Sequence, residues 1–248
     1  MMKDKKVLFF LVFIYAFAGG ISVFLPQNKF FSDFEYPAPE YVISIVTFLG
    51  IILIYGALAL LGLKLNDLSG FPKITDDRIN KKERFILPMV TGLIIGVTMV
   101  MGDLFFDGIN NYGKLPHPEF VMSFLASISA GIGEEIVFRL LLISFIMWLF
   151  GIKILKGKHN PKVFVIAVII SSVAFAASHT PSFIFILEQQ GKSFGFILGL
   201  ELFILNTLVS VFAAIYYKRY GIIAAMGIHF WADIMWHVIY GNILIDLF

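Results

Sequence analysis

Seven long apolar stretches dominate the sequence, and they restrict its possible folds more than any other feature. They lie near 7–25, 41–63, 85–105, 121–150, 163–187, 195–216 and 221–245. An α-helix needs about 20 mostly apolar residues to cross the hydrocarbon core of a bilayer. Of the 248 residues 59% are hydrophobic and 15% are charged, whereas soluble domains have roughly 45–50% apolar and 25% charged residues. We therefore expect an all-α, polytopic transmembrane helix bundle that forms a single domain over residues 1–248.

Two of these stretches leave the number of spans open. The stretch at 121–150 is too long for one simple span, so it could tilt, break near residues 131–133, or form two helices. The last stretch could break into a helix and a short tail. Seven spans are therefore predicted, with eight as the alternative.

The positive charges between the stretches predict the orientation of the chain. If the N-terminus is inside, 15 of the 19 Lys and Arg residues fall in inside segments, three fall outside, and one lies within a helix. The three outside are Lys29, Lys114 and Lys192. Because cytoplasmic loops carry an excess of Lys and Arg, we expect a cytoplasmic N-terminus. The chain is predicted to be an integral membrane protein in the plasma membrane of a prokaryote.

Net charge and cysteine content exclude several classes of function. The net charge of +2 gives no argument for a nucleic-acid partner, so the expected partner is the lipid bilayer. The chain has no cysteine, which excludes disulfides, thiolate metal sites and a cysteine nucleophile.

A few ionisable residues lie within the apolar stretches, where each costs at least roughly 2.5–3.5 kcal/mol to insert. Such residues usually face the bundle interior and serve a site or a pathway. They are Glu134, Glu135, Arg139, His179, Glu201, His229, Asp233 and His237.

The pair of glutamates is expected to divide into two roles. Glu135 and Arg139 are four residues apart, so they share one helix face and can pair. Glu134 points roughly a hundred degrees away and lacks that partner. A buried, unpaired carboxyl is suited to act as a general base near neutral pH. The alternative is a salt bridge that only joins helices.

Histidines on two later helices complete the set of candidates. His229 and Asp233 are also four residues apart, and His237 continues their stripe by one turn. An acidic residue behind a histidine orients it in many catalytic and metal sites, although it can also be purely structural. Counted from the expected cytoplasmic ends, Glu134, His179, His229 and Asp233 could meet in the middle to cytoplasmic part of the bundle.

Together these groups resemble the CAAX-protease and bacteriocin-processing family of intramembrane peptidases, also called the Abi family. The family pattern is Glu-Glu-x-x-x-Arg, then Phe-x-x-x-His, then His-x-x-x-Asn or Asp, on separate helices. It is matched here by Glu134, Glu135 and Arg139, by Phe175 and His179, and by His229 and Asp233. The resemblance covers about residues 120–240, which we expect to form the peptidase core.

The resemblance implies a membrane endopeptidase that acts on a CAAX-type prenylated or other membrane-associated peptide. By analogy, Glu134 activates a water molecule with help from His179, and Glu135 and Arg139 position the site. His229 and Asp233 would stabilise the oxyanion. The prenyl-specific enzymes usually carry Asn where this chain has Asp233, and an ionised Asp cannot donate a hydrogen bond to an oxyanion. This departure weakens the expectation of a prenyl substrate.

The sequence leaves alternatives for the metal and for the function. The family is widely labelled a metalloendopeptidase group, and Glu134, His179 and His229 would make a two-histidine, one-glutamate zinc set. A metal-free mechanism uses the same residues, and we favour it because the usual His-Glu-x-x-His signature is missing. The alternative functions are a non-catalytic bacteriocin-immunity or scaffold protein and an ion- or proton-coupled transporter.

Overall fold

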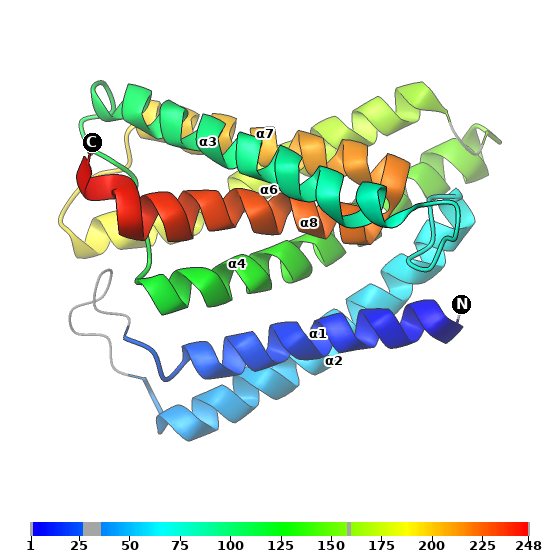
Figure 1. The fold of residues 1–248 in the computed structure, drawn as a ribbon, viewed down its shortest axis with the longest axis horizontal. Helices are drawn as coiled ribbons and strands as arrows, with labels where there is room; N and C mark the ends of the chain where they lie inside the picture. Colours follow the sequence, from blue (N-terminus) through cyan, green and yellow to red (C-terminus); the bar gives the residue numbers. More distant parts are fainter. Residues whose placement is uncertain (1, 27–35, 158–159, 248) are drawn as a thin grey trace.

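The structure, a computed structural model, describes residues 2–26, 36–157 and 160–247 (Figure 1). Regular secondary structure within these ranges is helical throughout. Lys29 and Lys158, which enter the charge count above, lie outside the described residues.

Seven helical segments of the described chain are long and apolar enough to cross a membrane, which confirms the expected fold class. The helices are α1 (Met2–Ser22), α2 (Glu40–Ser69), α3 (Leu87–Asp107), α4 (Phe120–Glu135), α6 (Pro161–Gln189), α7 (Phe196–Tyr220) and α8 (Ile222–Asp233). A π-helical turn, η1 (Lys82–Ile86), leads into α3. The cytoplasmic N-terminus and the prokaryotic plasma membrane stay predictions.

The fourth stretch forms one continuous span and does not break at its glycines. After α4 the chain continues through the π-helix η2 (Ile136–Ile143), the short α5 (Ser144–Ile146) and the π-helix η3 (Met147–Ile154). The glycines allow close packing instead. A Cβ at Gly133 would lie 2.7 Å from the ring of Tyr15, and one at Gly131 would lie 3.2 Å from Phe230 Cβ.

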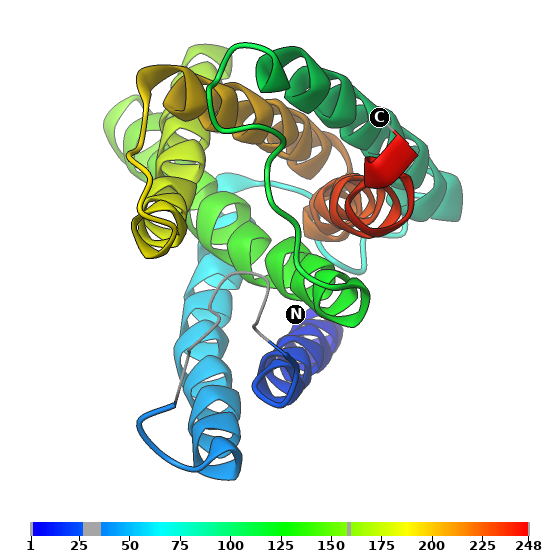
Figure 2. The same cartoon turned by 90° about the vertical axis from the view of Figure 1, so that its left-hand side faces the viewer.

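The last stretch is also one span, and it lies at the centre of the bundle. After α8 it continues as the π-helix η4 (Ile234–Leu244) and the 3₁₀ turn η5 (Ile245–Leu247). Helix α8 packs against α3, α4 and α7, whereas α1 and α2 pack together on the far side of α4 (Figures 1 and 2). The π-helix η2 begins directly after Glu135, within the first motif, and η4 begins directly after Asp233, the last residue of the third motif. Such wide turns are frequent at functional sites.

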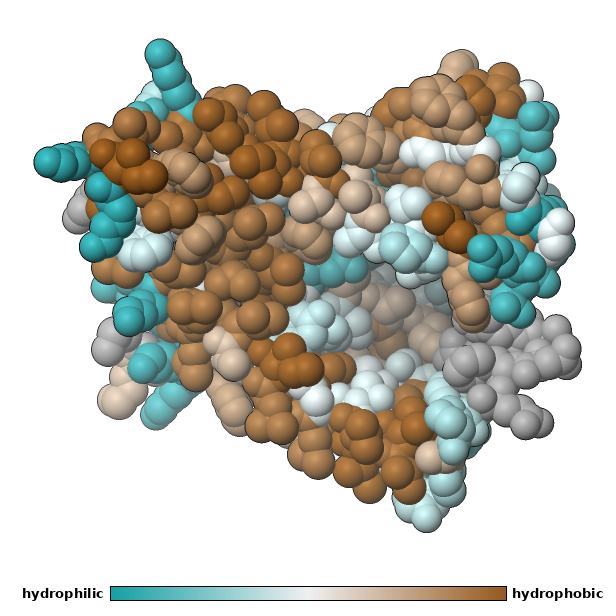
Figure 3. Space-filling view, turned by 180° about the vertical axis from the view of Figure 1, so that it is seen from behind, coloured by the Kyte–Doolittle hydropathy of each residue, from teal (hydrophilic) through white to brown (hydrophobic). Residues whose placement is uncertain are grey.

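The outer surface suits a lipid environment. Figure 3 shows a face that is mostly hydrophobic and hollowed near its middle, where paler, more hydrophilic residues lie. Many large apolar side chains are exposed, including Leu53, Ile94 and Phe105. A soluble protein rarely exposes so large a continuous apolar surface, so these side chains are expected to contact lipid.

Helix α8 is held close to α3 by two glycines one turn apart. A Cβ at Gly92 would lie 2.6 Å from the carbonyl oxygen of Ile228, and one at Gly96 would lie 2.7 Å from that of Ala232. Small residues at this spacing let membrane helices approach until their backbones touch. The contact fixes the helix that carries His229 and Asp233.

We therefore predict that Gly96→Ala destabilises the bundle by about 1–3 kcal/mol, because the added methyl group overpacks the α3–α8 contact. The matched control is Gly56→Ala, since a Cβ at Gly56 meets nothing within 4 Å. Thermal unfolding in detergent should show a lower midpoint for Gly96→Ala alone. Equal midpoints for the two variants would contradict the close contact.

Candidate active site

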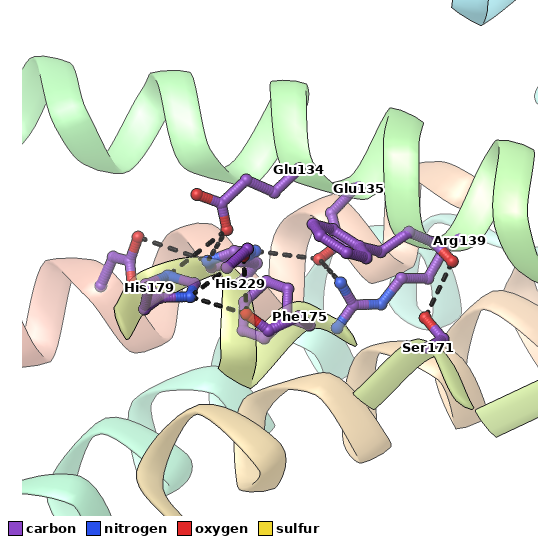
Figure 4. Close-up of polar contacts among 10 residues, drawn as sticks. Glu134, Glu135, Arg139, Ser171, Phe175, His179 and His229 are labelled. Carbon is purple, nitrogen blue, oxygen red and sulfur yellow. Dashed lines mark hydrogen bonds and ion pairs between the residues drawn. The ribbon is translucent and has the colours of Figure 1, made fainter. Parts of the chain in front are cut away.

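The predicted site residues come together inside the bundle from three neighbouring spans (Figure 4). The end of α4 and the start of η2 supply Glu134, Glu135 and Arg139, α6 supplies His179, and α8 supplies His229 and Asp233. The spans meet because α4 packs on α8 and because η2 packs on both α6 and α8.

Glu135 is the buried connection between two of these spans. Its Oε1 accepts a hydrogen bond from His229 Nδ1 at 2.9 Å and lies 3.0 Å from Arg139 Nη1. The side chains of Glu135 and Arg139 are completely buried. The predicted pairing of these two residues along the helix is therefore confirmed. The bond from His229 could not be predicted, because it joins residues 94 positions apart.

Phe175 packs against three of the charged or polar groups. The guanidinium carbon of Arg139 lies 4.7 Å from the centre of its ring, a cation–π distance. The rings of His179 and His229 lie 4.8 and 5.4 Å away. The Phe175 carbonyl also accepts a hydrogen bond from His179 Nδ1 at 2.8 Å. The Phe-x-x-x-His motif thus holds two imidazoles and one guanidinium in place.

Glu134 differs sharply from its neighbour in exposure. Its side chain is 32% exposed, so it is not the fully buried carboxyl that the sequence suggested. Its Oε2 is nevertheless buried and makes no hydrogen bond to any described residue. That oxygen lies 3.8 Å from His179 Nε2 and 3.8 Å from His229 Nε2. Three polar atoms therefore converge on one small region.

In both histidines, the hydrogen bond made by Nδ1 determines that Nε2 faces Glu134. His179 Nδ1 donates to the Phe175 carbonyl and His229 Nδ1 donates to Glu135, so both Nε2 atoms face Glu134. Separations of 3.8 Å are too long for direct hydrogen bonds. They suit groups that are bridged by a water molecule.

Glu134, His179 and His229 are of the types that bind zinc, but their separation does not match that of a metal site. Two imidazole nitrogens and a carboxylate oxygen are common zinc ligands, at about 2.0–2.2 Å from the metal. Among the described residues, however, no three His, Cys, Asp or Glu side chains lie close enough together to hold an ion. If a metal bound here, Glu134, His179 and His229 would be its ligands and it would polarise the attacking water.

Asp233 lies on the same side of His229 as Glu134. Its Oδ2 is 3.6 Å from His229 Nε2, while Glu135 occupies the other ring nitrogen. Orientation of His229, which Asp233 was one candidate to provide, is therefore the role of Glu135. Asp233 borders the cavity instead.

A cavity of about 180 Å³ connects these groups to apolar walls. Glu134, His179, His229, Asp233 and His237 form its polar side. The apolar side comes largely from α3, α7 and η4, and it includes Met99, Leu202, Leu205, Val209 and Trp236. The cavity thus offers an ionisable cluster next to a surface that accepts apolar groups.

Three residues near the site were missed by sequence reasoning. Asn206 lines the cavity, His117 contacts the lining residue His237, and Tyr15 packs on Gly133 beside Glu134. A polar Asn within the apolar sixth stretch was a usable signal for the first. Nothing in the sequence singles out Tyr15, because its role depends on how α1 packs.

The buried pair generates a stability prediction. Glu135→Gln should destabilise the protein by about 3–5 kcal/mol, because it leaves the buried Arg139 without a compensating charge. Glu134→Gln is the matched control, since Glu134 is partly exposed and makes no direct hydrogen bond. Unfolding midpoints in detergent measure both variants. Equal losses of stability would contradict the structural difference between the two glutamates.

Comparison with known proteins agrees with the site. The model of the family described as "Type II CAAX prenyl endopeptidase Rce1-like" matches residues 116–235. No curated protein and no solved structure matches the chain. The matched residues contain all three motifs, with Glu134, His179, His229 and Asp233. Residues 116–235 of the chain are therefore similar to the Rce1-like family of CAAX prenyl endopeptidases, in agreement with the three motifs.

Proposed function

We propose that the protein is an intramembrane endopeptidase in which Glu134 activates a water molecule to hydrolyse a peptide bond. The observation that carries the proposal is the unpartnered Oε2 of Glu134, 3.8 Å from two imidazole nitrogens. A water in that region can donate one hydrogen to Glu134 and the other to His179 Nε2. Its lone pair is then directed at a substrate carbonyl, which is the requirement for general-base catalysis.

The proposed reaction balances with the groups in the cluster. Glu134 takes a proton from the water, and the water oxygen bonds to the carbonyl carbon. When the carbon–nitrogen bond breaks, Glu134 returns the proton to the departing amine. One carboxylate therefore serves as base and then as acid.

His229 is the proposed donor to the oxyanion. Three carboxylates surround it, at 2.9 Å from Glu135, 3.6 Å from Asp233 and 3.8 Å from Glu134. Among the described residues of the cluster, the guanidinium of Arg139 alone opposes these negative charges, so a proton on the His229 ring is electrostatically favoured. A protonated His229 donates from Nδ1 to Glu135 and from Nε2 to the developing oxyanion. This assignment does not need Asp233 to act as a donor.

The proposed substrate is the C-terminal segment of a CAAX-type, prenylated peptide or another membrane-associated peptide. The similarity to the family supports a CAAX-type substrate. The apolar wall of the cavity supports a segment with apolar side chains, and the surrounding hydrophobic surface supports a lipid-anchored one. Because this chain has Asp233 where the prenyl-specific enzymes usually have Asn, the requirement for a prenyl group on the substrate needs a direct test.

We expect Glu134→Gln to reduce cleavage by at least about 10³-fold, since loss of a positioned base and acid removes most general catalysis. The variant should keep the unfolding midpoint of the wild type. Cleavage of a farnesylated CAAX peptide, followed by mass spectrometry, provides the measurement. Retention of full activity would exclude Glu134 as the base, whereas absence of cleavage by the folded wild type would favour the scaffold or transporter alternatives.

Metal dependence can be tested with the same assay. If the carboxylate and imidazoles act alone, extensive chelation and dialysis should leave the rate unchanged within about twofold. Loss of activity on chelation, with recovery on addition of zinc, would instead assign Glu134, His179 and His229 as metal ligands. A metal that binds outside the active site would change the unfolding midpoint but would not restore the rate of cleavage.

A further inference from the structure

His237 lies in the cavity but has no role in the proposed mechanism, and it lies beyond the residues that match the family. It is half-buried and stands two turns beyond His229 on the same helix face. Its Nδ1 is 3.1 Å from Nδ1 of His117, a residue of the segment before α4. Two histidines 120 positions apart are thus joined at one end of the cavity.

The side chain of His117 is closely packed by its neighbours. Its side chain is 3% exposed and packs edge-on against the rings of Trp236 and Tyr240, at 4.8 and 5.4 Å. Its ring also lies where a Cβ at position 241 would be, so only Gly241 leaves space for it. Asn242 closes the arrangement, because its Nδ2 donates to the carbonyl oxygens of His237 and Pro118.

The direction of the hydrogen bond between the two rings determines what His237 presents to the cavity, and a carboxylate bound there favours the direction in which His117 donates. A neutral imidazole carries one N–H, on one of its two nitrogens. When His117 donates from Nδ1, the accepting Nδ1 of His237 is bare, so the His237 proton must be on Nε2. His237 then presents an N–H donor to the cavity while both rings stay neutral.

A donor at this place matters because of the charges beside it. The described residues that line the cavity include Glu134 and Asp233 but no Lys or Arg. A negatively charged substrate group would therefore be repelled by those carboxylates, and it needs a hydrogen-bond donor among the lining residues. His237 follows Asp233 by one turn, on the side of the α8 stripe that leads away from Glu135 and Arg139.

The spacing also suits a short peptide segment. His229 and His237 are eight residues apart, which is about 12 Å at the rise of an α-helix. Three extended residues span about 10–11 Å. A peptide bond held at Glu134 and His229 would thus place a terminal carboxylate three residues later near His237.

We propose that His237, held by His117, is a positioning residue that binds the free C-terminal carboxylate of the substrate. The inference rests on the proposed peptidase function and names the part of the substrate that this end of the cavity recognises. Binding occurs through the N–H of His237, and the cleaved bond lies about three residues before the carboxylate.

The test uses the full-length protein and two farnesylated CAAX peptides that differ only at the C-terminus, as a free acid or as an amide. The wild type should cleave the acid with a KM lower by about 10-fold or more, since a hydrogen bond to a charged group is worth about that factor. His237→Ala should remove this preference by raising KM for the acid, with little change in kcat or in cleavage of the amide.

Three further variants separate positioning from folding. His117→Phe keeps a ring between Trp236 and Tyr240 but removes the bond to His237, so it should also lose the preference for the acid. His237→Gln keeps an N–H donor and should restore part of it. Ile243→Ala, at a 58% exposed position on the same helix, is the control and should behave as the wild type.

Each outcome has a distinct meaning. Equal cleavage of acid and amide by the wild type, or equal losses on both peptides in His237→Ala, would overturn the inference while leaving the peptidase function intact. If the folded wild type cleaves neither peptide, the proposed function fails and this inference fails with it. The expected result is that the wild type prefers the acid and that only His237→Ala and His117→Phe abolish this preference.

Discussion

The site depends on one buried carboxylate, that of Glu135, which joins Arg139 on its own span to His229 on another. All three side chains are at least 96% buried, so none of these charges is stabilised by water. Each group needs the others, because an isolated charge in such surroundings is costly. The interaction fixes the relative position of α4 and α8, and it also selects which nitrogen of His229 faces Glu134.

This division of work explains why two adjacent glutamates are required. Glu135 supplies structure and therefore has no freedom to exchange protons with a substrate. Glu134, one residue earlier, points about a hundred degrees away into the cavity and keeps an oxygen without a hydrogen-bond partner. Phe175 adds rigidity on the opposite side, where its ring contacts Arg139 and both imidazoles. These fixed surroundings would preorganise Glu134 for the role of base that is proposed for it.

Features set by local spacing could be predicted from the sequence, whereas those set by packing could not. Apolar length gave the seven spans, and the four-residue spacing gave the pairing of Glu135 with Arg139. The partial exposure of Glu134 and the bond from Glu135 to His229 depend on how three spans meet. The contact of His117 with His237 could not be predicted, because the space for the His117 ring exists only when Gly241 is brought beside it.

This membrane cluster is proposed to hydrolyse a peptide bond near the end of a lipid-anchored peptide. To test this function, the purified, folded protein is incubated with a farnesylated CAAX peptide and an unmodified control, and the products are identified by mass. The last three residues should be released from the farnesylated peptide, with one water added across the cleaved bond. If the farnesylated peptide stays intact, in detergent and in lipid vesicles, the proposed function is wrong.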